Sequence, residues 1–558
     1  MLVTGVTTVN IVIMSRVRHS VGGRIRGRYV VAVGASLALT STMALWTMEE
    51  PQSEAENMAA AFVDALNKRD IAAAAAMTTY PNAAAASLTQ MFDGLAADGA
   101  STSEFELGQF VDLSDESGFF TLDSDWNFGE GKDWQYSTRG SAKKLSVGWR
   151  ISWEPDVLAP DLLPDNSVRY VRTDAAPPLV FDAAQNVLMN ERTINAILLD
   201  PAQTPDPAAS AAQLADVIDV VAPLITADSM LSELAASAGN SILAVNLRDD
   251  DFAVLEDDLR AIPGVVVTQT PKLIAGDRRI TSPLLDSLRS AWQQNRDATA
   301  GWAVDVVNGD GSLTRQAGFQ GPGGPDLHAT LDPRIQLAAE EAVVSVGTAA
   351  SIVAIAPSTG AIVAVAQNSY ANEQGQIAFS AMYPAGSLSD LLAAGGVDAS
   401  GVGLGVNYAM PGLDAYTGSV PSGNSAVERI RTVGNETLEL SVTPFGLAQL
   451  GATIARGAAP VPSIVVGQPA APDTDPGTVA PAALANLRTL LQNSSHDRGL
   501  GGYAGLAGFA GASVDDRWFI GSRDDLAFAV YIEDAGDDDQ AVRMSTKLLD
   551  EIASGSTE

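Results

Sequence analysis

The sequence predicts a multidomain α+β protein. It would have an N-terminal membrane helix, a small α+β domain, a middle linker domain, and a C-terminal domain whose central antiparallel sheet is flanked by helices. Three observations predict this architecture. The length of 558 residues is too great for one hydrophobic core, and the apolar content of 46% is enough for several. Helical and strand-like patterns also occupy separate blocks of the chain, without a repeat of fixed period.

Charge is distributed unevenly along the chain. Residues 1–28 contain five basic residues and no acid, whereas the remainder has 28 basic and 67 acidic residues and a net charge of −39. A body this acidic repels nucleic acid, so nucleic-acid binding is excluded as a function. Cysteine is absent and only three histidines occur, so we expect no disulfide, no metal site and no cofactor.

The uncharged run 29–48 (YVVAVGASLALTSTMALWTM) has the length of a membrane-spanning helix. Arginines precede it and acids follow it, so residues 1–28 are predicted to be a cytoplasmic tail and the bulk of the chain to lie outside the cytoplasmic membrane. The alternative is a cleaved signal peptide with a cleavage site near Thr42-Met43-Ala44.

Residues 50–155 are predicted to form the small α+β domain. Two helical stretches, SEAENMAAAFVDALNKRD and NAAAASLTQMFDGL, come first, and short strands such as FELGQFVDL, GFFTL and LSVGWRISW follow. Residues 156–325 mix short strands with helices and end in the linker-like GFQGPGGP. In residues 326–556, SIVAIAP and AIVAVAQ are joined by Ser358-Thr359-Gly360, a strong hairpin signal, and AVRMSTKLLDEIAS predicts a terminal helix.

Three stretches of the last domain carry a family resemblance in the same order. LHATLDPRIQLAAEEAV, SIVAIAPSTGAIVAVAQ and VGNETLELSVTPFGLAQLGATIARGAAPVP resemble the transpeptidase domain of class B penicillin-binding proteins. The domain ending in GWRISWEPDVLAPDL resembles their nuclear-transport-factor-like (NTF2-like) N-terminal domain, and residues 165–325 resemble their pedestal. The resemblance covers about residues 50–555 and implies a D,D-transpeptidase of the cell wall.

That family activates a serine with a lysine in Ser-x-x-Lys, and completes its site with Ser-x-Asn and Lys-Thr-Gly. Here Tyr-Pro-Ala-Gly-Ser places Ser387 at the nucleophile position, but Asp390 stands where the lysine is expected. A carboxylate with an ordinary pKa near 3.9 is a weak base for a serine. The alternative role for Ser387 is that of a helix N-cap.

The other two elements are also altered. Phe509-Ala510-Gly511 stands at the Lys-Thr-Gly position, with Asp515 and Asp516 nearby. No side chain there would bind a substrate carboxylate. Ser422-Gly423-Asn424 lies only nine residues before Val433, closer than the family places it, and we interpret it as a turn. The consecutive Ser495-His496-Asp497 is interpreted as a loop. The site is therefore predicted to be inactive.

Three functions remain open. The first is a catalytically impaired relative that acts as a scaffold or regulator of cell-wall (peptidoglycan) synthesis or cell division, with wall-synthesis or division proteins as partners. The second is an active serine D,D-transpeptidase that binds penicillin through Ser387. The third is a non-covalent binding module for a peptidoglycan peptide or a β-lactam.

Overall fold

The computed structural model describes residues 53–96, 101–421, 431–433, 436–438 and 440–555. The predicted tail 1–28, the predicted span 29–48, and Ser422 and Asn424 lie outside these residues. Within the described part, no helix is long and apolar enough to cross a bilayer.

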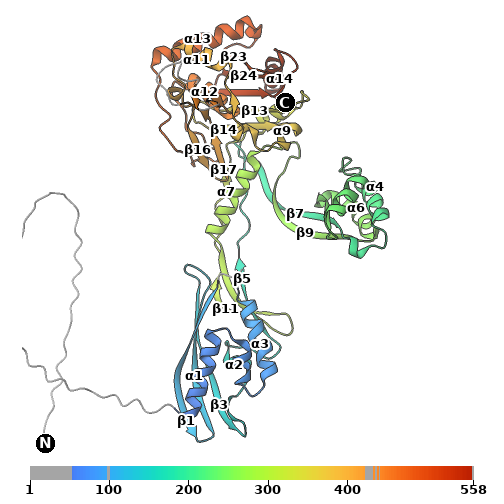
Figure 1. Ribbon diagram of the computed structural model, residues 1–558, viewed down its shortest axis with the longest axis vertical. Helices are drawn as coiled ribbons and strands as arrows, with labels where there is room; N and C mark the ends of the chain where they lie inside the picture. The colour runs from blue at the N-terminus through green and yellow to red at the C-terminus, as the bar shows by residue number, and fades with distance from the viewer. Residues whose placement is uncertain (1–52, 97–100, 422–430, 434–435, 439, 556–558) are drawn as a thin grey trace, which may run out of the picture. The chain divides into compact units, whose positions relative to one another are not determined.

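The N-terminal domain consists of three helices, one more than the two expected, followed by an antiparallel meander in the order β1-β2-β3-β4 (Figure 1). Alternate side chains of β2 face the helices, and Phe120, Leu122 and Trp126 are buried there. The elements are α1 (Glu54–Asn67), α2 (Ile71–Ala76), α3 (Pro81–Gly94), β1 (Thr102–Ser114), β2 (Ser117–Asn127), β3 (Asp133–Leu145) and β4 (Gly148–Ile151).

The middle region contains two further sheets. One has the order β11-β10-β5, and the other has the order β12-β6-β7-β8 with β9 paired to β7. Helices α4, α5 and α6 pack on β7 and β8 around their own core. The elements are η2 (Pro155–Val157), β5 (Ser167–Thr173), β6 (Val180–Phe181), β7 (Val187–Leu199), η3 (Pro201–Gln203), α4 (Pro207–Ile218), α5 (Ala227–Ala236), β8 (Ile242–Arg248), α6 (Asp249–Ala261), β9 (Val265–Ala275), α7 (Leu284–Ala298), β10 (Gly301–Val307), β11 (Leu313–Phe319) and β12 (Leu327–His328).

The C-terminal domain is built on an antiparallel sheet in the order β14-β13-β25-β24-β23. The predicted hairpin is confirmed, because β13 and β14 pair across the turn at Ser358-Thr359-Gly360. The predicted terminal helix is also present, as α14. The elements are α8 (Pro333–Val343), β13 (Ala350–Ile355), β14 (Ile362–Gln367), β23 (Ala507–Ser513), β24 (Asp516–Arg523), β25 (Leu526–Ile532) and α14 (Gln540–Ser554).

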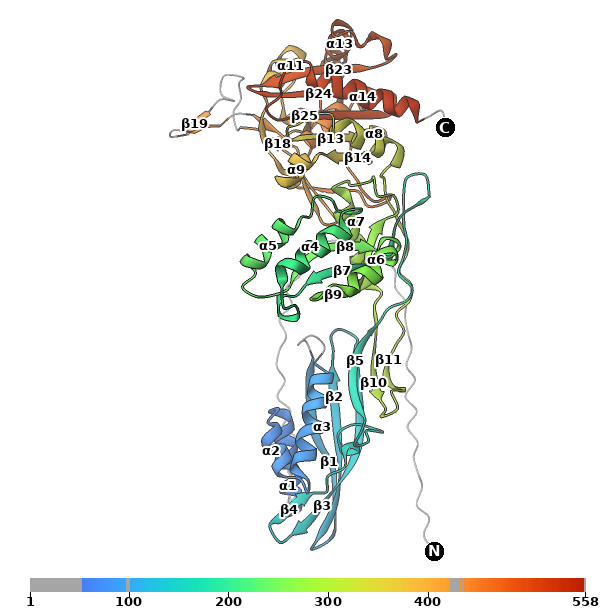
Figure 2. The same ribbon diagram turned by 90° about the vertical axis from the view of Figure 1, so that its right-hand side faces the viewer.

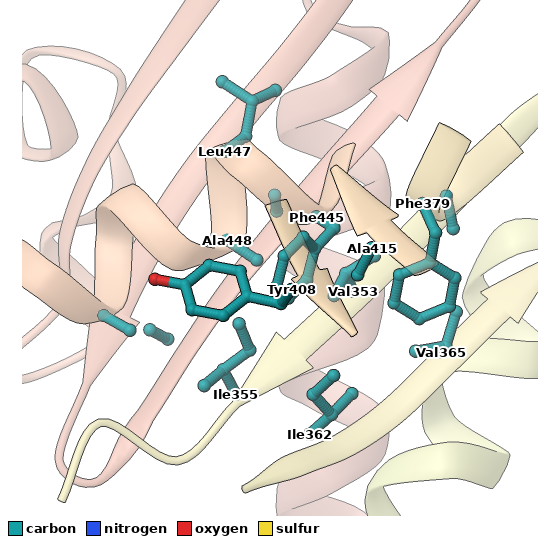
Figure 3. Packing of buried hydrophobic residues seen from close by; sticks show 14 of the residues in the cluster. Val353, Ile355, Ile362, Val365, Phe379, Tyr408, Ala415, Phe445, Leu447 and Ala448 are labelled. Atoms are coloured by element: carbon teal, nitrogen blue, oxygen red, sulfur yellow. The ribbon is translucent and has the colours of Figure 1, made fainter. Parts of the chain in front are cut away.

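Helices cover both faces of this sheet. Phe519, Phe528 and Val530 belong to the core that the sheet shares with α8 and α14. Alternate residues such as Tyr531 belong to the other core, which the sheet shares with α11 (Ser387–Gly395), α12 (Pro444–Arg456) and α13 (Pro481–Asp497). Figure 3 shows this second core, where Phe445 of α12 packs against neighbouring aromatic rings.

Short elements connect α11, α12 and the sheet. Between α11 and α12 the described chain forms a 3-10 turn and small strands, and it adds no long helix there. The elements are α9 (Ser369–Glu373), α10 (Ile377–Ser380), β15 (Tyr383–Pro384), η4 (Ser400–Val402), β16 (Asn407–Met410), β17 (Leu413–Tyr416), β18 (Gly418–Ser419), β19 (Arg431–Val433), β20 (Glu436–Leu438), β21 (Ser441–Val442), β22 (Ala471–Pro472) and η5 (Leu500–Gly502).

Candidate functional site

Ser387 is the first residue of α11, and the glycine before it brings the helix onto strand β23. Gly386 has φ +51° and ψ −127°, a conformation that side-chain-bearing residues avoid. A Cβ atom at this position would lie 2.1 Å from the carbonyl oxygen of Ala512. The amide of Ala385 donates to the carbonyl of Leu440 at 2.8 Å, which holds the chain just before the helix. The start of α11 is therefore fixed from both sides.

The hydroxyl of half-buried Ser387 faces the same strand. The backbone amide of Ala512 donates to Ser387 Oγ at 2.9 Å. Gly386 occupies the N-cap position of α11 and no side chain caps the helix, so the alternative N-cap role of Ser387 is wrong. A backbone amide next to a nucleophile is the kind of donor that stabilises an oxyanion. The described site thus retains a serine and a suitable donor side by side.

The general base that such a serine needs is missing from the described residues. Asp390, at the expected lysine position, lies one turn along α11 with an exposed side chain. Lys547 is the only lysine in residues 326–556. Its amine donates to the carbonyl oxygen of Glu341 at 2.7 Å and forms an ion pair with that residue's carboxylate at 2.9 Å. This ion pair joins α14 to α8, on the opposite side of the sheet from Ser387.

Strand β23, which the sequence predicts to lie at the Lys-Thr-Gly position, is closely packed and offers no cation. The ring of Phe509 lies 5.8 Å from the ring of Trp518. A Cβ atom at Gly511 would lie 2.0 Å from that indole, so the retained glycine makes room for Trp518. Neither Phe509 nor Ala510 offers a positive charge or a hydroxyl to a substrate carboxylate.

Two stacked tyrosines and two carboxylates lie beside this end of the sheet. The rings of Tyr383 and Tyr531 are 4.1 Å apart and nearly parallel. Tyr531 donates its phenol proton to Asp516 at 2.7 Å, and Tyr383 donates to Glu533. Burial first, and the adjacent carboxylates second, raise the pKa of both phenols above its ordinary value. The phenols therefore stay protonated at neutral pH and cannot act as the base for Ser387.

A cavity of about 640 Å³ is lined in part by Met382. Tyr416, Ser419, Asp398 and Asp475 also line it. Its polar, acidic lining suits a ligand that carries an amine or hydroxyl groups.

Ser495-His496-Asp497 forms the last three residues of α13, so the predicted loop is wrong there. Ser495 Oγ donates to the carbonyl of Leu491 at 2.7 Å and accepts from the amide of Gly508 at 2.9 Å. The residue is buried and ties α13 to β23, which explains the helix. In the part of the chain that the structure describes, no three His, Cys, Asp or Glu side chains gather to hold a metal ion.

The comparisons with known proteins concern the first domain. Residues 54–166 match the family model of the NTF2-like N-terminal transpeptidase domain. This match supports a penicillin-binding-protein-like family for the chain. No curated protein matches the chain.

Sequence reasoning placed Ser387, Asp390 and Phe509-Ala510-Gly511 at one site, and the structure brings Ser387 and this strand together. The sequence did not reveal the amide of Ala512, because a backbone donor has no sequence signature. It also missed the pairing of Tyr383 with Glu533, which lie 150 residues apart. The glycine at 386, directly before the serine, was the available signal for a close approach.

Proposed function

We propose that the chain is a penicillin-binding-protein-like cell-wall protein whose serine does not acylate, and that it acts as a scaffold or regulator of wall synthesis or division. One observation carries this proposal. The only lysine of the domain is paired with Glu341 on the far side of the sheet from Ser387. Serine nucleophiles need an adjacent base at neutral pH, and no lysine or histidine contacts Ser387 among the described residues.

Electrostatics supports the same proposal. A β-lactam or a stem peptide presents a carboxylate to this kind of site. Here Asp390 lies in the first turn of α11 with Ser387, and Asp516 lies opposite Ser513, the neighbour of Ala512. No cationic side chain replaces the lysine of Lys-Thr-Gly. Like charges raise the free energy of both substrate binding and the developing oxyanion.

The sequence supports the proposed location. Residues 29–48 would anchor the chain in the cytoplasmic membrane, with the tail 1–28 inside and residues 50–558 outside. A non-acylating relative that keeps its sheet and its N-terminal domain still offers surfaces to wall-synthesis or division proteins.

The cavity beside Met382 favours a second function, the non-covalent binding of a peptidoglycan peptide. The acidic Asp475 would pair with a free amine of the peptide. This binding needs no acyl intermediate, so it is compatible with the first proposal.

The proposal is tested by incubating the purified full-length chain with a fluorescent penicillin and measuring covalent adduct by intact mass. We expect no adduct in the wild type or in Ser387→Ala. A stoichiometric adduct that Ser387→Ala abolishes would show an active acyl-serine enzyme and overturn the proposal. A triple variant, Asp390→Lys with Phe509→Lys and Ala510→Thr, restores the missing groups and tests whether their loss explains the inactivity.

The scaffold role is tested separately by cross-linking with a carboxyl-reactive reagent in intact cells, followed by affinity purification from solubilised membranes. We expect wall-synthesis or division proteins to be enriched over a membrane-protein control. Their absence would refute the scaffold role and leave the non-covalent binding module. That candidate is tested by calorimetric titration with a stem peptide, with Asp475→Asn expected to weaken binding.

A further inference from the structure

One end of the N-terminal domain gathers its exposed apolar side chains. All six large apolar side chains that are strongly exposed in the described part of residues 53–156 lie there, and Leu113 and Val147 are the most open after Tyr80, at 61% and 67%. We call this the hairpin-end surface, and its members are Tyr80, Val111, Leu113, Phe119, Leu145 and Val147. The concentration of these six side chains in one part of the domain indicates an interaction surface.

Strand pairing shows why these residues meet. Val111 lies directly opposite Phe119 beside the β1–β2 turn, and Leu145 lies opposite Gly148 at the β3–β4 turn. The amide of Lys144 donates to the carbonyl of Glu116 at 2.9 Å, which holds the two turns side by side.

Tyr80 joins them from the helical layer. The amide of its neighbour Thr79 donates to the carbonyl of Ile151 on β4 at 2.9 Å. The surface is therefore formed by two hairpin turns and the start of α3.

The β3–β4 hairpin is basic, although the chain after residue 28 is acidic overall. Residues 134–153 contain Arg139, Lys143, Lys144 and Arg150 and no acid. Two of the six lysines of the chain lie in this hairpin. The neighbouring β1–β2 turn carries acids at 115 and 116, so attraction to an anionic surface comes from the β3–β4 side.

The chain enters the domain at the same end. Asn67, the last residue of α1, exchanges hydrogen bonds with the backbone of Phe105 near the start of β1. The 14 residues of α1 extend about 20 Å from there. Both views show α1 alongside the sheet (Figure 2). Because the last residue of α1 is held near the start of β1, the first turn of α1 lies toward the hairpin turns. The predicted span ends at Met48, and the five residues between it and Glu54 reach at most about 20 Å.

We propose that the hairpin-end surface rests on the outer leaflet of the membrane that residues 29–48 anchor. Leu113, Leu145 and Val147 would enter the interfacial layer, and Lys143 would lie near lipid phosphates. Apolar area and attraction to anionic lipid both contribute to such interfacial binding. The proposal rests on residues 29–48 spanning the membrane. The hairpin-end surface would then be a second lipid contact, and it would set the orientation of the N-terminal domain on the bilayer.

The absence of cysteine allows a direct test with the full chain. Val147→Cys carries an environment-sensitive fluorophore in one sample, and Val254→Cys carries it in the control. Val254 is an equally apolar residue of α6 that is 80% exposed. Both chains are reconstituted in nanodiscs of phosphatidylcholine with one third phosphatidylglycerol, and nitroxide-labelled lipid serves as the quencher.

We expect the fluorophore at 147 to be quenched at least about threefold more than that at 254. The additional substitutions Leu145→Ser and Lys143→Glu should reduce this difference by about half or more. Unchanged melting temperatures would show that these turn positions leave the fold intact.

Equal quenching at the two positions in chains that co-elute with nanodiscs would overturn the lipid contact and leave the surface for a protein partner. Chains that do not co-elute with nanodiscs would overturn the anchor and the lipid contact together. Neither outcome depends on penicillin acylation, so failure here is distinguishable from failure of the proposed function.

Discussion

Replacing Gly386 by alanine tests whether the close approach of α11 to β23 holds the site together. The Cβ atom would lie 2.1 Å from the Ala512 carbonyl oxygen, which is backbone and cannot move aside freely. Backbone strain at this φ and ψ costs about 1–3 kcal/mol, and the steric clash about 1–3 kcal/mol more. The expected loss of domain stability is therefore about 2–6 kcal/mol. It should be accompanied by loss of the hydrogen bond from Ala512 to Ser387.

Gly396→Ala is the matched control, since this glycine ends the same helix at φ +70° and has no atom within 4 Å of the Cβ position. It should cost only about 1–2 kcal/mol, from strain alone. The assay is urea unfolding followed by hydrogen exchange of peptides covering β23 to β25, which reports on this domain. Equal losses in Gly386→Ala and Gly396→Ala would refute the reasoning that close packing of α11 on β23 fixes the position of Ser387.

Three further predictions concern the same sheet. Val514 is a β-branched residue at φ +49° and is 86% exposed. Val514→Gly should therefore stabilise the domain by about 1 kcal/mol in urea unfolding. Asp524 has a similar φ, and Asp524→Gly should stabilise the domain by less. The raised pKa of Tyr531 means that its stabilising contribution is complete below the unfolded pKa near 10 and is lost as pH rises above it. In Tyr531→Phe, the free energy of unfolding should therefore fall less as the pH rises from neutral to above about 10. The urea midpoint measures this, and the same pH profile as in the wild type would contradict it. Gly511→Ala should cost at least about 2 kcal/mol, because the indole of Trp518 occupies the Cβ position, and a neutral effect on thermal unfolding would show that the ring can move.

The fold was predictable where local signals were strong. The β13–β14 hairpin follows from two apolar runs around a turn tripeptide, and α14 follows from its amphipathic spacing. The order β14-β13-β25-β24-β23 could not be derived from local patterns, because β13 pairs with a strand more than 170 residues later. The resemblance to a known family supplied only the expectation of a central antiparallel sheet flanked by helices.

The site was predictable only in part. The position of Ser387 followed from its motif, but its hydrogen bond to Ala512 depends on a backbone group 125 residues away. The helical ending at Ser495 was missed because Ser, His and Asp are all weak helix formers. Tertiary packing supports the helical ending, because buried Ser495 accepts a hydrogen bond from the amide of Gly508 on β23.

The solitary lysine of the C-terminal domain also sets what amine chemistry can reveal about it. Every amine-directed cross-linker or dye that reacts with this domain must attach at Lys547, on the side where α14 meets α8. A partner bound near Ser387 would escape such reagents entirely, so a negative result would carry no information about that face. Because the chain has no cysteine, one introduced at an exposed position of α11, such as Ser389, would give that face its own single point of attachment.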